Sequence, residues 1–242
     1  MLTKSQIKYI QSLGHKKHRD AEGLFLAEGP KIVGEWLKEP VLRLQTIYAT
    51  QQWIDQQDHL TVPVQVVTED ELGKISQLQS PNQVLAVIYQ QQSPVTLTAD
   101  SSLILALDTI QDPGNLGTII RIADWFGINA IVCSRECADI YNPKVVQATM
   151  GSLPRVKVLY ADLAEWIESQ PDCRIYAAAL EGQDVGKMAA LNAGVLVIGN
   201  ESKGISERVM AKVNVRITIP RKGKAESLNA AVATGILLSK LT

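Results

Sequence analysis

Short apolar runs alternate with helical segments over the second half of the chain, and this alternation predicts a parallel sheet. Six runs are typical of buried strands, and five segments between or after them have the spacing of helices. Alternation of this kind favours a mostly parallel sheet with helices on both faces. The expected strands are 103–108, 130–133, 156–159, 174–179, 195–198 and 215–219, and the expected helices are 116–126, 144–150, 163–170, 206–212 and 228–241.

The first ninety residues carry shorter segments of both periods and predict a smaller α/β unit. Ile7, Ile10 and Leu13 would share one face of an amphipathic helix that Gly14 closes. Pro30 is placed to open a second helix, because proline is favoured in the first helical turn. Strands are expected at 25–27, 42–49, 64–67 and 84–90, and further helices at 51–57 and 69–78.

A polar stretch with a proline separates the two patterns. It runs from Gln90 through Pro94 to Ser102 and has the composition of a linker. We therefore predict a first domain at 1–92, a linker at 93–101 and a second domain at 102–242.

Composition limits the classes of partner. The 242 residues carry a net charge of −1, so no global field attracts nucleic acid, and any RNA partner requires a local basic patch. Three cysteines without metal-ligand spacing are typical of reduced thiols in a cytosolic protein, and we expect no metal site. We find no signal peptide and no apolar run long enough to cross a membrane, so the cytoplasm is the expected location.

Familiar nucleotide-binding motifs do not fit. The glycines that follow strand 103–108 lack the Gly-x-Gly-x-x-Gly spacing of a dinucleotide site. The segment from Gly199 to Ser206 has the glycine spacing of a phosphate-binding loop, but Ile205 stands where the lysine is required. All three histidines lie within the first 59 residues, and no Gly-x-Ser-x-Gly elbow occurs, so triad hydrolysis is disfavoured.

The last fifty residues carry the clearest signs of a ligand site. Strands 195–198 and 215–219 each end in a polar, glycine-containing loop, and ligands of parallel sheets bind beyond such strand ends. Ser227 is predicted to cap the final helix. That helix is apolar almost all round, which indicates cover on every side, by its own domain and by a second subunit.

Three segments in this order resemble the motifs of one family. They are similar to the SpoU/TrmH family of RNA 2′-O-ribose methyltransferases, in the SPOUT class. The first ninety residues more loosely resemble that family's substrate-binding domain, a small α/β RNA-binding fold shared with some ribosomal proteins. The segments are Asp112–Arg121, Ile198–Ser206 and, in the third, Ile219, Pro220, Gly223 and Ser227–Asn229; Tyr141–Leu153 also has the family's pattern, and the front domain matches at Lys16, Lys17, Arg19 and 25–29.

The resemblance implies a parallel-sheet α/β domain with a deep trefoil knot that binds S-adenosylmethionine. It implies methyl transfer to a ribose 2′-hydroxyl of ribosomal or transfer RNA, and a homodimer whose active sites draw on both subunits. The chain departs from the family pattern at Arg221, where an apolar residue is common, and at Ala230 and Ala231, where Val-Ser is commoner.

Roles for individual residues follow from the same resemblance. Catalysis would involve Arg121, Asn115, Glu201, Ser227 and Asn229, with Glu201 bracing an arginine. The cofactor would be held by Gly199, Ile219 and Leu228. RNA would contact Lys16, Lys17, Arg19, Arg221, Lys222 and Lys224. The last three would line an RNA-facing rim together with Lys203, Arg155 and Lys157.

Several alternatives stay open on the residues alone. Arg121 either removes the hydroxyl proton or stabilises the phosphate and the alkoxide, since a guanidinium is normally a donor only. Ser227 and Asn229 either cap the last helix or also orient the ribose, and Ile219 and Leu228 also suit a core. The basic run near Lys17 is either a solvated loop or a phosphate contact. A knotted RNA-binding protein without catalysis is the alternative to an enzyme.

Overall fold

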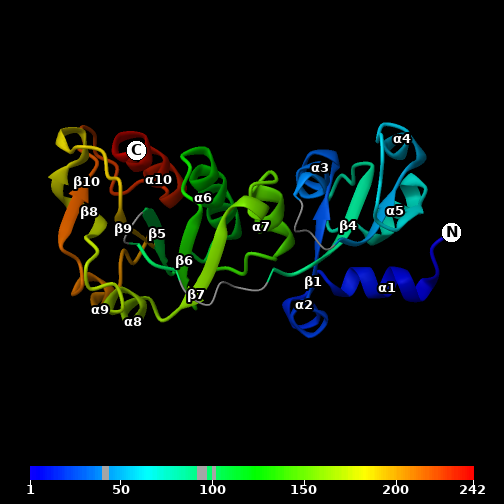
Figure 1. Cartoon of the computed structure of the whole chain (residues 1–242), viewed down its shortest axis with the longest axis horizontal. Helices are drawn as coiled ribbons and strands as arrows, with labels where there is room; N and C mark the ends of the chain where they lie inside the picture. Colours follow the sequence, from blue (N-terminus) through cyan, green and yellow to red (C-terminus); the bar gives the residue numbers. More distant parts are fainter. Residues whose placement is uncertain (40–43, 92–96, 100–101) are drawn as a thin grey trace. The chain divides into compact units, whose positions relative to one another are not determined.

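The computed structural model of the chain describes residues 1–39, 44–91, 97–99 and 102–242, and Figure 1 traces its elements. Two compact units result. Unit 1 comprises Met1–Gln92 and Asp139–Pro154, and unit 2 comprises Ser93–Ala138 and Arg155–Thr242. The predicted linker at 93–101 lies largely outside the described residues. The sequence assigned 139–154 to the second domain, whereas its contacts group it with unit 1.

Unit 1 is built on a mixed four-stranded sheet in the order β1-β4-β2-β3. Strand β4 pairs antiparallel with β1 and β2, and β2 pairs parallel with β3. The strands are β1 (Leu24–Glu28), β2 (Leu44–Ala49), β3 (Val64–Val66) and β4 (Val84–Tyr89). The helices are α1 (Lys4–Ser12), α2 (Lys16–Glu22), α3 (Pro30–Lys38), α4 (Gln51–Ile54), α5 (Glu69–Ile75) and α7 (Pro143–Ala148).

Local sequence explains where the first helices begin and end. Thr3 starts α1 with a capping box to Gln6, and the buried Ile10 joins a core cluster with Leu72 of α5. The basic run after Gly14 forms the helix α2 rather than a loop. Lysine, arginine, alanine and glutamate are good helix formers, and the left-handed Gly23 ends the helix.

Unit 2 holds a six-stranded sheet in the order β10-β8-β9-β5-β6-β7, and each of its pairings is parallel. The predicted α/β class with a parallel sheet is therefore confirmed, and the knot stays a prediction. The strands are β5 (Leu103–Asp108), β6 (Ala130–Ser134), β7 (Lys157–Ala161), β8 (Ile175–Asp184), β9 (Gly194–Gly199) and β10 (Val215–Thr218). The helices are α6 (Pro113–Trp125), α8 (Leu163–Glu168), α9 (Glu207–Met210) and α10 (Ala230–Leu241), with 3-10 turns at Leu153–Arg155 in the chain segment between α7 and β7 and at Val185–Lys187 after β8.

Alternate residues of these strands face two helix layers. Ile104, Ala106 and Val195 join a core cluster with residues of α8 and α9, on one side of the sheet. Helices α6 and α10 pack against each other on the opposite side (Figure 1). No helix in the described part of the chain is long and apolar enough to cross a membrane.

The start of the last helix differs from the prediction. Helix α10 begins at Ala230, and its N-cap is Asn229, whose side chain accepts from the N–H groups of Ala231 and Val232. Ser227 therefore does not cap the helix. An asparagine amide oxygen is as good a cap acceptor as a serine hydroxyl, and it stands next to the apolar run. Val232 is 51% exposed, and cover by a second subunit stays a prediction.

A candidate active site at the carboxyl ends of β5 and β9

Strands β5 and β9 are parallel neighbours, and the connections that follow them lead to opposite sides of the sheet. Their last residues, Asp108 and Gly199, lie in register. From β5 the chain continues to β6 on one side, and from β9 it continues to β10 at the far edge on the other side. Such a switch point opens a crevice beyond the strand ends, where ligands of parallel sheets bind.

The loop that follows β9 is closed on itself. Asn200 and Gly204 exchange two backbone hydrogen bonds of 3.1 and 2.9 Å. The Asn200 Oδ1 atom also accepts from the N–H groups of Ser202 at 2.9 Å and Lys203 at 3.1 Å. A Cβ at Gly199 would lie 2.6 Å from the Gly204 oxygen. Glycine is thus required at 199 by the loop's own backbone, before any cofactor is considered.

Two polar side chains fasten this loop to β5, and sequence reasoning missed both. Asn200 Nδ2 donates to the Thr109 carbonyl at 2.9 Å, and the Ser206 N–H donates to Asp108 Oδ2 at 2.7 Å. Asp108 is 4% exposed. The signal was available, because a carboxylate directly after the apolar run of β5 has to find a partner where it is buried.

The thiols Cys133 and Cys137 are buried next to the turn that follows β5. The Ile110 N–H donates to Cys137 Sγ at 3.2 Å, and Cys137 donates to the Leu107 carbonyl at 3.3 Å. A hydrogen bond between the two thiols lowers the pKa of Cys137 and raises the pKa of Cys133, which is fully buried. Cys133 and Cys137 are thiols that form no disulfide.

Three of the predicted catalytic residues meet in one cluster. Asn115 Nδ2 donates to Glu201 Oε1, and Asn229 Nδ2 donates to Asn115 Oδ1 at 2.8 Å. The Ala230 N–H, in the first turn of α10, lies 3.4 Å from Glu201 Oε1. The cluster joins the loop after β9 to the first turns of α6 and α10. Glu201 contacts an asparagine and a helix N-terminus here, and the predicted arginine partner stays a prediction.

Helix capping explains why Asn115 is available to this cluster. Asp112 accepts the Asn115 N–H at 2.8 Å and so caps α6. The Asn115 side chain is therefore not needed at the helix end. Asn229 serves both purposes, since its oxygen caps α10 while its NH₂ group reaches Asn115.

The other two predicted catalytic residues lie outside the cluster. Arg121 is an exposed residue of α6, six positions beyond Asn115. It makes no hydrogen bond or ion pair with any residue that the structure describes. Ser227 is likewise exposed and has no hydrogen-bond partner in the described part of the chain. Both side chains are open to a substrate or to a second subunit.

The segment after β10 is open. Residues 220–229 are all exposed. Among the residues that the structure describes, the backbone N–H groups of 221–229 have no hydrogen-bond partner. Ile219 is half-buried and Leu228 is 45% exposed. Unpaired donors beside an exposed leucine are groups that can hold a polar, flat ligand such as a nucleoside.

The predicted RNA-contact residues divide into exposed and buried ones. Lys16 and Lys17 are exposed on α2, and Arg221, Lys222 and Lys224 are exposed in the open segment. Arg19 is 1% exposed, and its guanidinium donates to the Gly14 carbonyl at 2.8 Å and to Asp139 at 2.6 Å. Arg19 thus departs from its predicted role, because its guanidinium is buried inside unit 1 and paired with Asp139.

The three remaining rim residues also divide. Arg155 forms an ion pair with Asp124 at 2.8 Å, whereas Lys157 and Lys203 are exposed.

Comparison with known proteins agrees with this geometry. Residues 102–239 match the SpoU rRNA methylase family, and residues 4–86 match the MRM3-like substrate binding domain. The 23S rRNA (guanosine(2553)-2′-O)-methyltransferase RlmP of Bacillus subtilis is 29% identical over 239 residues, which cover 98% of this chain and 95% of the relative.

Solved structures share the fold over the whole length. The AdoMet-bound rRNA methyltransferase of Sinorhizobium meliloti is 32% identical, with a TM-score of 0.87 over 100% of this chain and 95% of that one. The SpoU methyltransferase AviRb of Streptomyces viridochromogenes, at 23% identity, has a TM-score of 0.86 over 99% of this chain and 97% of that one, which shows the fold. Since the family match covers more than half of the chain, this protein belongs to the SpoU rRNA methylase family.

Proposed function

We propose that this protein transfers the methyl group of S-adenosylmethionine to a ribose 2′-hydroxyl of RNA. The observation that carries the proposal is the Asn115–Glu201–Asn229 cluster at the switch point, next to the open segment 220–229. Two of the similar proteins support it by name, since one is a 2′-O-methyltransferase and another was solved with AdoMet bound.

The residues present fit the cofactor. The unpaired N–H groups of 221–229 supply donors for its adenine and ribose, and Leu228 supplies an exposed apolar surface. Gly199 is the last residue of β9, and Ile219 directly follows β10 at the start of this segment. When bound, S-adenosylmethionine supplies a methyl group already activated by its sulfonium, so the protein needs no metal for the transfer.

The protein's own task is alignment and proton removal. In the transfer, bound S-adenosylmethionine would supply the methyl group to the ribose oxygen and leave as S-adenosylhomocysteine, and the hydroxyl proton would pass to solvent water. We propose that the Arg121 side chain lies next to the ribose 2′-oxygen during the transfer. Its exposed guanidinium has no partner among the described residues, and it would stabilise the negative charge that develops as the proton departs. Asn115, Asn229 and Glu201 hold the surrounding loops in register.

We also propose that two copies of the chain complete each site. Helix α10 presents Val232 to solvent, although the helix is apolar almost all round. Arg121 on the neighbouring α6 is free to reach a site on the second copy.

Transfer of labelled methyl tests the proposal directly. The full chain is incubated with methyl-labelled S-adenosylmethionine and total RNA, which is then digested to nucleosides. We expect label in one 2′-O-methylated nucleoside. Label in a base would contradict ribose transfer. Heat of S-adenosylmethionine binding without any transfer to ribosomal or transfer RNA would favour the rival, a knotted RNA-binding protein without catalysis.

A further inference from the structure

Unit 1 contains a small groove that the proposed function has not used. It lies between the segment after α5 and one face of α7, and it encloses about 290 Å³. This is close to the lower end of the range of about 300–1,000 Å³ for small-molecule sites, so the groove suits one flat group rather than a helix. Its lining consists of Gln77, Leu78, Pro143, Lys144, Gln147 and Ala148.

A buried carboxylate holds the first wall in place. Glu28, at the end of β1, is 5% exposed. It accepts hydrogen bonds from the Ser76 hydroxyl and from the Gln77 N–H, the latter at 2.9 Å. Burial raises the pKa of this carboxyl, while the two hydrogen bonds lower it. The Ser76 hydroxyl in turn accepts the Leu78 N–H at 3.0 Å, so the wall has a defined shape.

The second wall is anchored to the same unit. The 2.6 Å ion pair of the buried Arg19 with the half-buried Asp139 fixes the segment that leads into α7. Next to it, the Tyr141 ring lies 4.7 Å from the Phe25 ring, and burial raises the pKa of Tyr141 to about 12. Arg19, predicted to bind RNA, therefore holds the segment before α7 in place and does not itself line the groove.

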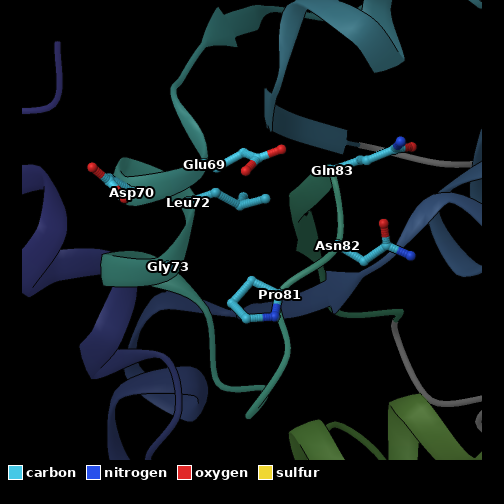
Figure 2. A pocket seen from close by; sticks show the side chains of 7 residues that line it. All are labelled: Glu69, Asp70, Leu72, Gly73, Pro81, Asn82 and Gln83. Carbon is cyan, nitrogen blue, oxygen red and sulfur yellow. The ribbon is translucent and has the colours of Figure 1, made fainter.

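The α7 groove differs in charge from a second cavity of unit 1. That cavity lies between α5 and residues 81–83, and two carboxylates, Glu69 and Asp70, line it. Figure 2 shows the side chains of Glu69 and Leu72 pointing into it. In the α7 groove, Lys144 is the only charged lining residue, and it is exposed. A polyanion is therefore attracted to the groove and repelled by the acidic cavity.

We infer that the α7 groove receives one unstacked base of a single-stranded RNA segment, with an adjoining phosphate on Lys144. The inference rests on the proposed function and extends it to the substrate. Leu78, Pro143 and Ala148 supply apolar contact for a base face. Gln77 and Gln147 each carry a donor and an acceptor suited to base edges. Sequence-specific RNA recognition uses such splayed-out bases.

Matched variants of the full chain test the groove. The probe is a fluorescent single-stranded RNA of ten mixed nucleotides, and its dissociation constant is measured by anisotropy at fixed salt. We expect Lys144→Ala with Gln147→Ala to raise this constant at least tenfold. Lys74→Ala, an exposed lysine of α5 that lines neither cavity, should change it less than twofold. Calorimetry should give an unchanged affinity for S-adenosylmethionine.

Three outcomes would overturn the inference. Equal losses in the Lys144 and Lys74 variants would mean diffuse electrostatic attraction, and no loss in either would leave the base without a site. A changed dimerisation constant with unchanged RNA affinity would mean that a second copy covers the groove. Ala148→Trp, which fills the groove, gives an independent check, with circular dichroism to verify folding. Methyl transfer by the unaltered protein is measured alongside, so failure of the groove is distinguished from failure of the proposed function.

Discussion

The loop after β9 and the segment after β10 lie in the same unit, but the chain holds them in different ways. The first, 199–206, is bonded within itself through Asn200 and to β5 through Asp108. The second, 220–229, is exposed throughout, and its one hydrogen bond to the chain's own groups before the α10 cap is from Arg221 to the Ala225 carbonyl, among the described residues.

This difference separates two tasks within one site. A loop that satisfies its own polar groups keeps its shape without a ligand, and a segment with unpaired donors has hydrogen bonds to offer one. We interpret 199–206 as the fixed wall of the site. Segment 220–229 is then the part that orders around the cofactor and the RNA.

Removing the Arg121 side chain should give the largest effect. It should lower the rate of methyl transfer without altering cofactor binding by the two loops. We expect Arg121→Ala to lower the rate of methyl transfer by about 10²–10³-fold, as loss of one charge-stabilising donor does. The dissociation constant of S-adenosylmethionine should stay within a few fold, because neither loop contacts this side chain in the structure. Single-turnover transfer and calorimetry measure the two quantities.

Arg121→Lys is the informative control for that variant. A lysine keeps the charge but lacks the planar fork, so partial recovery would indicate charge stabilisation rather than paired hydrogen bonds. Near-normal turnover in Arg121→Ala would remove the residue from the mechanism.

A methyl group added at Gly199 should damage the fixed wall. The new Cβ would lie 2.6 Å from the Gly204 oxygen, so the backbone at residue 199 or at Gly204 has to move. We expect a loss of about 3 kcal/mol of unfolding free energy and of cofactor affinity, measured by urea unfolding and calorimetry. In the open segment, a Cβ at Gly223 would meet nothing within 4 Å, so Gly223→Ala should change stability by less than about 0.5 kcal/mol. Equal effects at the two glycines would contradict the comparison.

Hydrogen exchange should distinguish the loops by their response to cofactor. At a cofactor concentration of about one hundred times its dissociation constant, binding stabilises the bound state by about 2.7 kcal/mol. Amides of 221–229 that contact the cofactor should therefore exchange about 100-fold more slowly. The amides of Asn200, Ser202, Lys203 and Gly204 are already hydrogen-bonded and should change little. Mass spectrometry of peptides from each loop measures both. Uniform protection of the two loops would mean that neither is formed in advance.

Much of the fold was predictable because its pattern is local. Strands β5, β6 and β9 are nearly continuous apolar runs, as buried parallel strands are. Each predicted strand of unit 2 is present, although β8 extends to Asp184, beyond its predicted end at 179. Segment 139–154 was not assigned to its unit, since its place depends on distant contacts such as Arg19 with Asp139. Periodicity carries no information about a partner 120 positions away in sequence.

Part of the candidate site was also predictable from the sequence. Asn115, Glu201 and Asn229 come from three motifs, and the structure brings them together. Asp108 was missed although a carboxylate at the end of the apolar run of β5 indicated a buried group in need of a partner, and Asn200 was missed because it resembles any polar residue after a strand. The cap of α10 was misplaced by two positions, since Ser227 and Asn229 are both good cap residues and only backbone geometry selects one.

That choice of cap gives the smallest of these effects. Asn229→Ala removes the acceptor for Ala231 and Val232 N–H and the donor to Asn115, so we expect a loss of about 1 kcal/mol in unfolding free energy. Ser227→Ala should leave stability unchanged, because its hydroxyl has no partner among the described residues. Both variants are unfolded in urea with and without S-adenosylmethionine. If Ser227→Ala weakens only the cofactor-bound or RNA-bound state, the hydroxyl acts on a ligand; if it destabilises the free protein as much as Asn229→Ala, the open segment is structured in a way that the comparison denies.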